Sequence, residues 1–279
     1  MGTEPRQTVD PEALKPGLSL RFLYRTPPGR LLLKAVTRPA VSKLVGRVLS
    51  SSVSKRAIPG FIRKHNIDLE RYDLSDIHSY NDFFCRPLKP ECLHMEDGLI
   101  SPCDAKLTVY TITNGATFAI KGSEYSLAEL LDDEALAREF AGGTCLVFRL
   151  SVDNYHRYCY FDDCEEAGFR AIPGRLHTVQ PIAFHRYKVF HQNSREVTIL
   201  NTRHFGRAVQ VEVGALCVGR IDNYHKSGHH ARGEEKGKFL FGGSTILLLL
   251  QTVTVDEELV ANSRQGLETV VSIGEKIGH

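Results

Sequence analysis

The stretch KGKFLFGGSTILLLLQ, residues 236–251, restricts the fold more than any other part of the chain. Its aliphatic run, 246–250, predicts a buried strand. The run follows Gly242-Gly243 and a hydroxyl residue almost directly. A Gly-Gly pair weakens a strand and usually marks a bulge, a sharp bend or a close backbone approach. A buried strand that starts in this way needs a reason beyond packing.

Short alternating or apolar runs, separated by Gly, Pro, Asn and Asp, dominate the chain from residue 98 onward. They predict an antiparallel sheet or a barrel-like assembly. One helix is expected within this region, over 126–143, with Ser126 as its N-cap. Before residue 98 the apolar spacing is helical, and Pro39 is expected to divide one long pattern into two helices. The first 28 residues are expected to be extended. The sequence therefore predicts an α+β fold, with N-terminal helices followed by an antiparallel β-rich core.

Charge is distributed unevenly along the chain. The formal net charge is only +2, but residues 1–65 hold 13 Lys and Arg against 3 Asp and Glu, a net +10, which leaves −8 for the remainder. Basic residues at 30–64 alternate with apolar ones, which is typical of an amphipathic helix lying on an anionic membrane surface. The alternative is an ordinary surface helix packed on the domain.

Several classes of function are disfavoured by what the sequence lacks. No apolar stretch approaches the roughly 18 residues of a spanning helix, and no signal-peptide core is present. The seven cysteines form no CxxC pair, which indicates reduced thiols in a cytosolic setting. His225, His229 and His230 lie near acidic residues, but the stretch is interpreted as a loop, and no metal site is predicted. No recognised nucleic-acid module accompanies the basic residues.

The Gly243-Ser244 bond carries a specific chemical possibility. A serine hydroxyl can attack the preceding carbonyl, because glycine offers no side chain to block the approach. An ester then replaces the amide, and β-elimination followed by hydrolysis leaves a pyruvoyl group as a new N-terminus. This carbonyl can bind an amine and accept electrons from a breaking C–C bond, which is the work of an electron-sink cofactor.

The segment RGEEKGKFLFGGSTILLL, 232–249, resembles the maturation segment of the phosphatidylserine decarboxylases. Further family-like stretches follow the family's order: YNDFFCRPLKP (80–90), LISPCDAKL (99–107), DNYHRYCYFDDC (153–164), IPGRLHTVQPIA (172–183), NSREVTIL (193–200), VEVGALCVGRI (211–221) and VVSIGEKIG (270–278). The likeness runs from about residue 20 to the C-terminus.

The resemblance implies a role for each matching residue. Ser244 would become the pyruvoyl group, with residues 1–243 as the β chain and 244–279 as the α chain. Asp104 matches the aspartate of a Ser-His-Asp-like processing triad, although Ala105 replaces the usual glycine after it. His156 matches the first histidine of the family's DYHRxH pattern, which is associated with decarboxylation.

The second histidine of that pattern is Cys159 here. A cysteine acts as a base only as a thiolate, and its ordinary pKa of about 8.5 would have to be lowered. Three explanations remain open: His156 serves both maturation and turnover, His177 supplies an imidazole from a neighbouring strand, or the chain matures poorly. A histidine rescue is the favoured interpretation.

The resemblance thus implies a self-processing, pyruvoyl-dependent enzyme that converts phosphatidylserine to phosphatidylethanolamine. It would act as a homodimer, peripherally on the cytoplasmic face of the cell membrane. The implied organisation is a basic helical membrane-contacting region, 1–75, and a catalytic domain, 76–279. The alternatives are a pyruvoyl enzyme acting on a free or aromatic amino acid, and a lipid-binding homologue that is never cleaved.

Overall fold

The computed structural model describes residues 5–120, 123–216, 220–224, 228–240 and 244–279. Its centre is a sheet of nine strands, and every pairing between neighbours in it is antiparallel. In spatial order the strands are β1 (Thr8–Val9), β15 (Glu268–Val271), β3 (Ala105–Thr111), β6 (Thr144–Leu150), β14 (Ser244–Leu250), β10 (Arg207–Val213), β9 (Arg195–Thr202), β8 (Cys164–Ile172) and β12 (His229–His230). The α+β class is confirmed.

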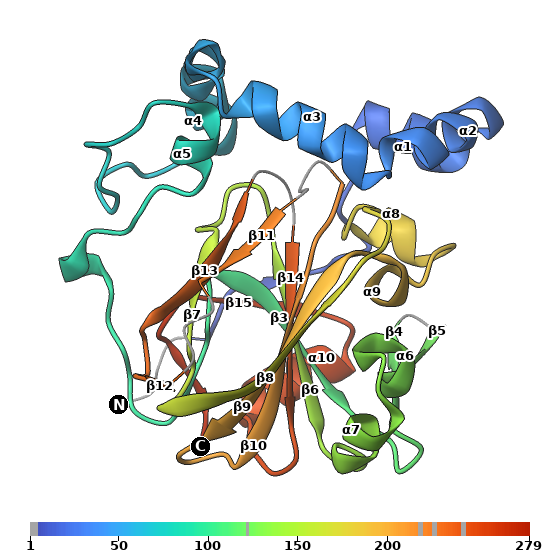
Figure 1. The fold of residues 1–279 in the computed structure, drawn as a ribbon, viewed down its shortest axis with the longest axis vertical. Helices are drawn as coiled ribbons and strands as arrows, with labels where there is room; N and C mark the ends of the chain where they lie inside the picture. Colours follow the sequence, from blue (N-terminus) through green and yellow to red (C-terminus); the bar gives the residue numbers. More distant parts are fainter. Residues whose placement is uncertain (1–4, 121–122, 217–219, 225–227, 241–243) are drawn as a thin grey trace.

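Smaller sheets and helices surround this sheet (Figure 1). The smaller sheets are β11 (Arg220–Asn223) with β13 (Glu235–Leu240) and β7 (Arg157–Cys159), β16 (Lys276–Gly278) with β2 (Leu99–Ile100), and β4 (Thr117–Ile120) with β5 (Ser123–Ser126). The helices are α1 (Leu18–Arg25), α2 (Pro27–Val36), α3 (Pro39–Leu49), η1 (Ser52–Ala57), α4 (Ile58–His65), α5 (Tyr80–Phe84), η2 (Pro90–Cys92), α6 (Leu127–Leu131), α7 (Glu134–Glu139), α8 (Pro181–Phe184), α9 (Val189–Gln192) and α10 (Glu257–Arg264).

Two local predictions need correction. The first 28 residues are not simply extended, because α1 forms at Leu18–Arg25 and Thr26 then caps α2 by accepting a hydrogen bond from Gly29 N. The helix expected over 126–143 is two helices, because Asp132 takes the left-handed conformation (φ 53°) between α6 and α7. The expected N-cap at Ser126 and the division at Pro39 are confirmed.

Strand β14 lies in the middle of the large sheet, between β6 and β10, and all seven of its residues are buried. Side chains alternate between the two faces of a strand. Ile246, Leu248 and Leu250 enter one core, which also holds residues of β7 and β13; we call this side the inner face. Leu247 and Leu249 enter the other core, with the helices α6 to α9; we call that side the outer face. The aliphatic run therefore supplies both cores at once.

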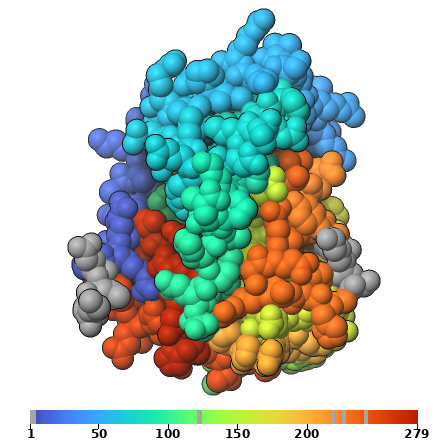
Figure 2. Space-filling model, turned by 90° about the vertical axis from the view of Figure 1, so that its left-hand side faces the viewer, coloured from blue at the N-terminus to red at the C-terminus, as the bar shows by residue number. Residues whose placement is uncertain are grey.

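The N-terminal helices lie across the end of the sheet at which β14 begins (Figure 1) and cover that end of the molecule (Figure 2). Hydrogen bonds hold them to the segment after β8: Thr178 N donates to Tyr24 Oη (2.9 Å), and Leu176 N donates to the carbonyl of Thr37 (3.0 Å). No helix within the described ranges is both long and apolar enough to cross a membrane. The domain boundary near residue 75 stays a prediction, and β1 joins the large sheet from the N-terminal side of it.

A buried ion pair fixes β13, the strand that leads to the Gly-Gly segment. Lys236 Nζ donates to Glu212 Oε1 on β10 at 2.9 Å, and neither side chain is exposed to solvent. Gln210 Nε2 and Asn223 Nδ2 also donate to the Glu212 carboxylate, at 2.9 and 3.1 Å. A buried charge pair is tolerated when its remaining hydrogen-bonding capacity is met in this way. The pair ties the small sheet onto the inner face of the large one.

Removing one partner of this pair is expected to destabilise the fold strongly. Lys236→Met leaves the Glu212 charge buried without its cation, and should lower the free energy of unfolding by about 3–5 kcal/mol. The measurement is urea-induced unfolding of chains that also carry Ser244→Ala, so that every sample has one covalent form. Lys238 lies on β13, as Lys236 does, and is a partly exposed partner of Asp222. Lys238→Met should lower the free energy of unfolding by less than about 1 kcal/mol. Equal losses in the two variants would contradict this assignment.

Candidate active site

Ser244 is the first residue of β14 and is fully buried. Its Oγ has no hydrogen-bond partner among the residues that the structure describes, and the same holds for Thr245 Oγ1 on the opposite face. An unsatisfied buried hydroxyl costs about 1–3 kcal/mol, so native structures rarely keep one without a reason. A hydroxyl that is held dry and uncommitted is available for reaction with the adjacent backbone. Gly242 and Gly243 themselves lie outside the described residues.

The alternation along β14 gives the direction of the Ser244 side chain. It lies two residues before Ile246 and shares its parity with Ile246, Leu248 and Leu250, so it projects onto the inner face. Its partner across the sheet on β6 is Leu150, another member of the inner core. Any group that acts on Ser244 Oγ must therefore reach it from the inner face.

His156 enters from the small sheet that covers this inner face. It immediately precedes β7, and its carbonyl accepts a hydrogen bond from Phe239 N on β13 at 2.9 Å. The imidazole is fully buried and packs against the Phe84 ring, with centroids 3.9 Å apart. Its Nδ1 lies 2.8 Å from the carbonyl of Asn154. Since a carbonyl only accepts, Nδ1 carries the proton, and neutral His156 has its lone pair on Nε2.

Asp104 is connected to His156 through the backbone of Tyr155, the residue that precedes His156. One carboxylate oxygen accepts from Ile273 N at 2.9 Å, and the Tyr155 backbone also hydrogen-bonds the carboxylate. Burial raises the pKa of Asp104, while these backbone hydrogen bonds and the charge of Arg71 act in the opposite direction. Asp104 and His156 are thus linked through the backbone of Tyr155, and the small sheet that carries His156 covers the face onto which Ser244 projects.

Cys159 also lies on the inner face, at the end of β7, but its environment is wrong for a base. The side chain is buried in the inner core, and its backbone N–H donates to the carbonyl of Pro102 at 2.9 Å. Burial raises the pKa of the thiol to about 12. A thiolate is therefore scarce near neutral pH, and the thiol behaves as a small apolar side chain.

His177 lies apart from these groups. Its ring stacks on Tyr187 (centroids 4.1 Å apart), and Nδ1 lies 3.3 Å from Tyr24 Oη. Both tyrosines pack with the outer core, on the far side of the sheet from the Ser244 side chain. Burial, followed by the charge of Arg175, lowers the pKa of His177 to about 4. The contacts of His177 join helix α1 to the β domain.

The histidines that precede the Gly-Gly segment have other contacts. His230 stacks on Tyr160 with centroids 4.2 Å apart, and its Nδ1 lies 3.0 Å from Glu234 Oε1. His229 is exposed, and His225 lies outside the described residues. Within the described ranges, no three His, Cys, Asp or Glu side chains are grouped as metal ligands.

A cavity of about 850 Å³ opens beside the start of β14. It lies between helices α1 and α2 and the end of β6, and Leu150, the partner of Ser244 across the sheet, forms part of its wall. Most of its surface is apolar, and its cationic lining residues are Lys15, Lys106 and Arg149. The end of the sheet that holds Ser244 therefore has a space large enough for a small amphiphile beside it.

Sequence reasoning missed several contributors to this site. The carbonyl of Asn154 orients His156, but a backbone contact leaves no mark on residue type. Lys106 lies within the quoted SPCDAKL motif, yet only the packing of α1 and α2 turns it into a cavity wall. The Glu212–Lys236 pair could not be predicted either, because its two residues lie on strands of two different sheets.

Comparison with known proteins agrees with this geometry. The family profile described as phosphatidylserine decarboxylase matches residues 80–279. A phosphatidylserine decarboxylase proenzyme 2 of Clostridium acetobutylicum is 45% identical over 265 residues, covering 93% of this chain and 91% of the relative. Proenzymes of the same name come from Clostridium perfringens (39% identical over 273 residues, 93% and 92% covered) and Chlamydia felis (34% over 271 residues, 93% and 91% covered).

Matches of this length and identity identify the chain as an enzyme of the carboxy-lyase class. The chain belongs to the phosphatidylserine decarboxylase family. These matches confirm the family resemblance seen in the sequence. The relatives are named as proenzymes.

The buried histidines predict how stability depends on pH. His177 and His191 both have their pKa lowered to about 4 by burial, whereas an unfolded histidine binds a proton below about pH 6.5. Between these values the unfolded chain binds more protons, so stability is lost as pH falls from about 6.5 toward 4. In the Ser244→Ala background, His177→Gln should make this slope shallower in urea unfolding measured across that range. An unchanged slope would show that His177 does not stay neutral in the fold.

Proposed function

We propose that this chain cleaves itself between Gly243 and Ser244 and then decarboxylates phosphatidylserine to phosphatidylethanolamine. The observation that carries the proposal is the Ser244 hydroxyl at the start of the central strand: it is buried, has no hydrogen-bond partner among the described residues, and projects onto the face that the small sheet carrying His156 covers. The family membership and the proenzyme names of the relatives support it.

In the proposed maturation, Ser244 Oγ attacks the carbonyl of Gly243. The new C–O bond replaces the peptide C–N bond, and the freed amine takes up a proton. Removal of the Ser244 α-proton then breaks the Cβ–Oγ bond, releasing residue 243 as a carboxylate, and water displaces ammonia to leave the pyruvoyl carbonyl. His156 Nε2 is our candidate for the base, because the Asn154 carbonyl holds Nδ1 as the protonated nitrogen. Asp104 would stabilise the charge that develops on the imidazole.

The pyruvoyl group would supply a carbonyl that holds the substrate amine and accepts the electron pair left by CO2. The buried environment of residue 244 fits this group, because it excludes water and lacks competing hydrogen-bond donors within the described residues. In turnover, His156 would return a proton to the former α-carbon of the substrate. The inner face thus uses one imidazole for both stages.

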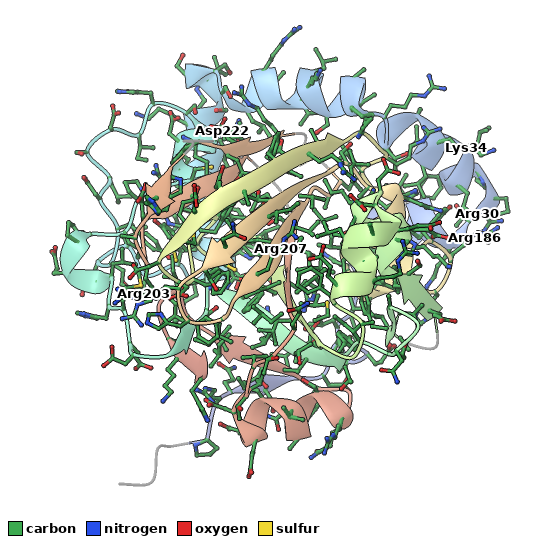
Figure 3. All side chains as sticks on the ribbon, turned by 60° about the horizontal axis from the view of Figure 1, so that its bottom comes forward. Arg30, Lys34, Arg186, Arg203, Arg207 and Asp222 are labelled. Carbon is green, nitrogen blue, oxygen red and sulfur yellow. The ribbon has the colours of Figure 1, made fainter. Side chains whose placement is uncertain are left out.

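The N-terminal helices support contact with a membrane. Apolar side chains stand exposed on them, and the largest exposed fractions are Leu18 82%, Leu31 72%, Val53 66%, Leu44 61% and Val48 61%. Basic residues share these helices, and Figure 3 shows Arg30 and Lys34 of α2 at the outer rim of the molecule. A surface on which exposed apolar side chains and cations share the same helices suits the boundary of an anionic bilayer. We therefore propose a peripheral location on the cytoplasmic face of the cell membrane. A homodimer remains a proposal from the family resemblance alone.

Substitution of the candidate bases should separate their roles in cleavage. His156→Ala is expected to slow the appearance of the two chains on a denaturing gel by about 10²–10⁴-fold, the usual effect of losing a general base. Cys159→Ala and His177→Gln should still be cleaved, because the thiol is protonated and His177 lies on the outer face. Cleavage of His156→Ala at the wild-type rate would rule out the assigned base, and loss of cleavage in His177→Gln alone would transfer the role to that residue.

Membrane contact should depend on the exposed apolar side chains. A Leu31→Ser/Leu44→Ser/Val48→Ser variant is expected to pellet with phosphatidylglycerol-containing vesicles at least about tenfold more weakly, since each buried aliphatic side chain contributes roughly 1.5–3 kcal/mol. Phe169→Ser, which changes an exposed apolar residue on β8, serves as the control and should bind as the wild type does. Unchanged pelleting of the triple variant would contradict the proposed orientation.

The substrate class can be tested on the wild-type protein. CO2 release should be seen with phosphatidylserine in vesicles and not with free serine or tryptophan. Release from a free amino acid alone would favour the alternative pyruvoyl enzyme. An uncleaved chain that pellets with vesicles but releases no CO2 would be the lipid-binding homologue.

A further inference from the structure

One partly buried cation in the wall of the cavity beside Ser244 lacks a direct counter-charge within the described residues. Lys106 projects from β3, and its Nζ donates to Ser151 Oγ at 2.6 Å. No carboxylate in the described ranges lies within the 4.0 Å ion-pair distance of this ammonium, although Asp153 lines the same cavity. Burial lowers the pKa of Lys106, and the nearby charge of Arg149 lowers it further.

Of the other two cations that line the cavity, Lys15 is exposed to solvent, and Arg149 is already neutralised. Arg149 donates to both carboxylate oxygens of Glu268, and both side chains are about nine-tenths buried. An ammonium has three donors, and Lys106 uses one of them on a neutral hydroxyl. A partly buried cation with unused donors favours an anionic ligand, because a charge-assisted hydrogen bond is about twice as strong as a neutral one.

Most of the remaining surface of the cavity is apolar and continues to the outside of the molecule. Leu20, Leu23 and Val36, which pack against the outer core, form part of its wall. Phe22 and Leu32 line it as well, and 45% and 49% of their surfaces are exposed. These two side chains lie on the same helices as the apolar surface that we propose for membrane contact. The mouth of the cavity therefore opens where acyl chains would be available.

We propose that this cavity binds the glycerophosphate part of a phospholipid, with the phosphodiester on Lys106 Nζ and the acyl chains leaving between α1 and α2. This inference rests on the proposed function for its substrate. Lys106 shares the outer face with Thr245, and its Nζ is bonded to Ser151, the residue after the Ser244 partner Leu150. A head group that extends from a phosphate at Lys106 would therefore reach residue 244 around the end of the sheet at which β14 begins. Lys106 is then a substrate-binding residue that favours a lipid over a free amino acid.

A binding experiment can test this without any turnover. The probe is dihexanoyl phosphatidic acid, which carries the phosphate and short acyl chains but no serine, titrated into the Ser244→Ala protein by calorimetry. Lys106→Gln, which keeps a hydrogen-bond donor for Ser151 but removes the charge, should bind the probe at least about tenfold more weakly. Lys106→Arg should retain most of the affinity. Lys276→Met, which removes an exposed lysine far from the cavity, should bind as the parent does.

Competition and turnover distinguish the possible failures. Inorganic phosphate at the same concentration should not displace the probe; if it does, the site is a simple anion site and the lipid assignment is overturned. In the cleaved enzyme, Lys106→Gln should raise KM for phosphatidylserine with little change in kcat. In another outcome the wild type turns over phosphatidylserine, and Lys106→Gln binds the probe and turns over the lipid just as the wild type does. This result would overturn the inference and leave the proposed function standing. Lys106-dependent probe binding by a wild type that releases no CO2 from the lipid would support the site and defeat the proposed function.

Discussion

The structure depends on a strand that is buried on both faces and begins with a serine. β14 contributes alternate side chains to two cores, so the position of Ser244 is fixed by the packing of every aliphatic residue after it. Its hydroxyl lies in a dry environment without a hydrogen-bond partner in the described part of the chain. Such a residue would be a defect in a purely structural strand. If the chain breaks its own backbone at this point, as we propose, the same burial holds the reacting atom still and keeps water away.

The sheet also distinguishes two candidate bases, His156 and His177, which the sequence alone could not tell apart. His156 and His177 both lie in family-like motifs, and residue type alone makes either of them a possible base. The parity of β14 directs Ser244 to the inner face, where His156 arrives on the small sheet, whereas His177 stacks with Tyr24 and Tyr187 beside the outer core. The position of the family's second histidine is occupied by Cys159, whose buried thiol stays protonated near neutral pH. His156 is therefore the imidazole that we propose for both maturation and turnover.

Much of the architecture could be predicted because it is local. The order of helices and strands, the division at Pro39 and the cap at Ser126 follow from periodicity and capping chemistry. Helix α1 was missed because its short pattern is surrounded by proline and glycine, and the bend at Asp132 was missed because its left-handed backbone is a property of the packed structure. Asp104, Ser244 and His156 were predicted through motifs, and their roles stay predictions. Lys106 and the Glu212–Lys236 pair were not, because their roles come from contacts between strands that are distant in sequence.

The central claim is that the bond before Ser244 breaks and leaves a carbonyl. It is tested most directly by the intact mass of the purified wild-type protein under denaturing conditions, before and after treatment with hydroxylamine. The account predicts two chains that divide at residue 243, of which only the smaller gains the mass of an oxime. A single unbroken chain of 279 residues that still releases CO2 from phosphatidylserine would contradict it.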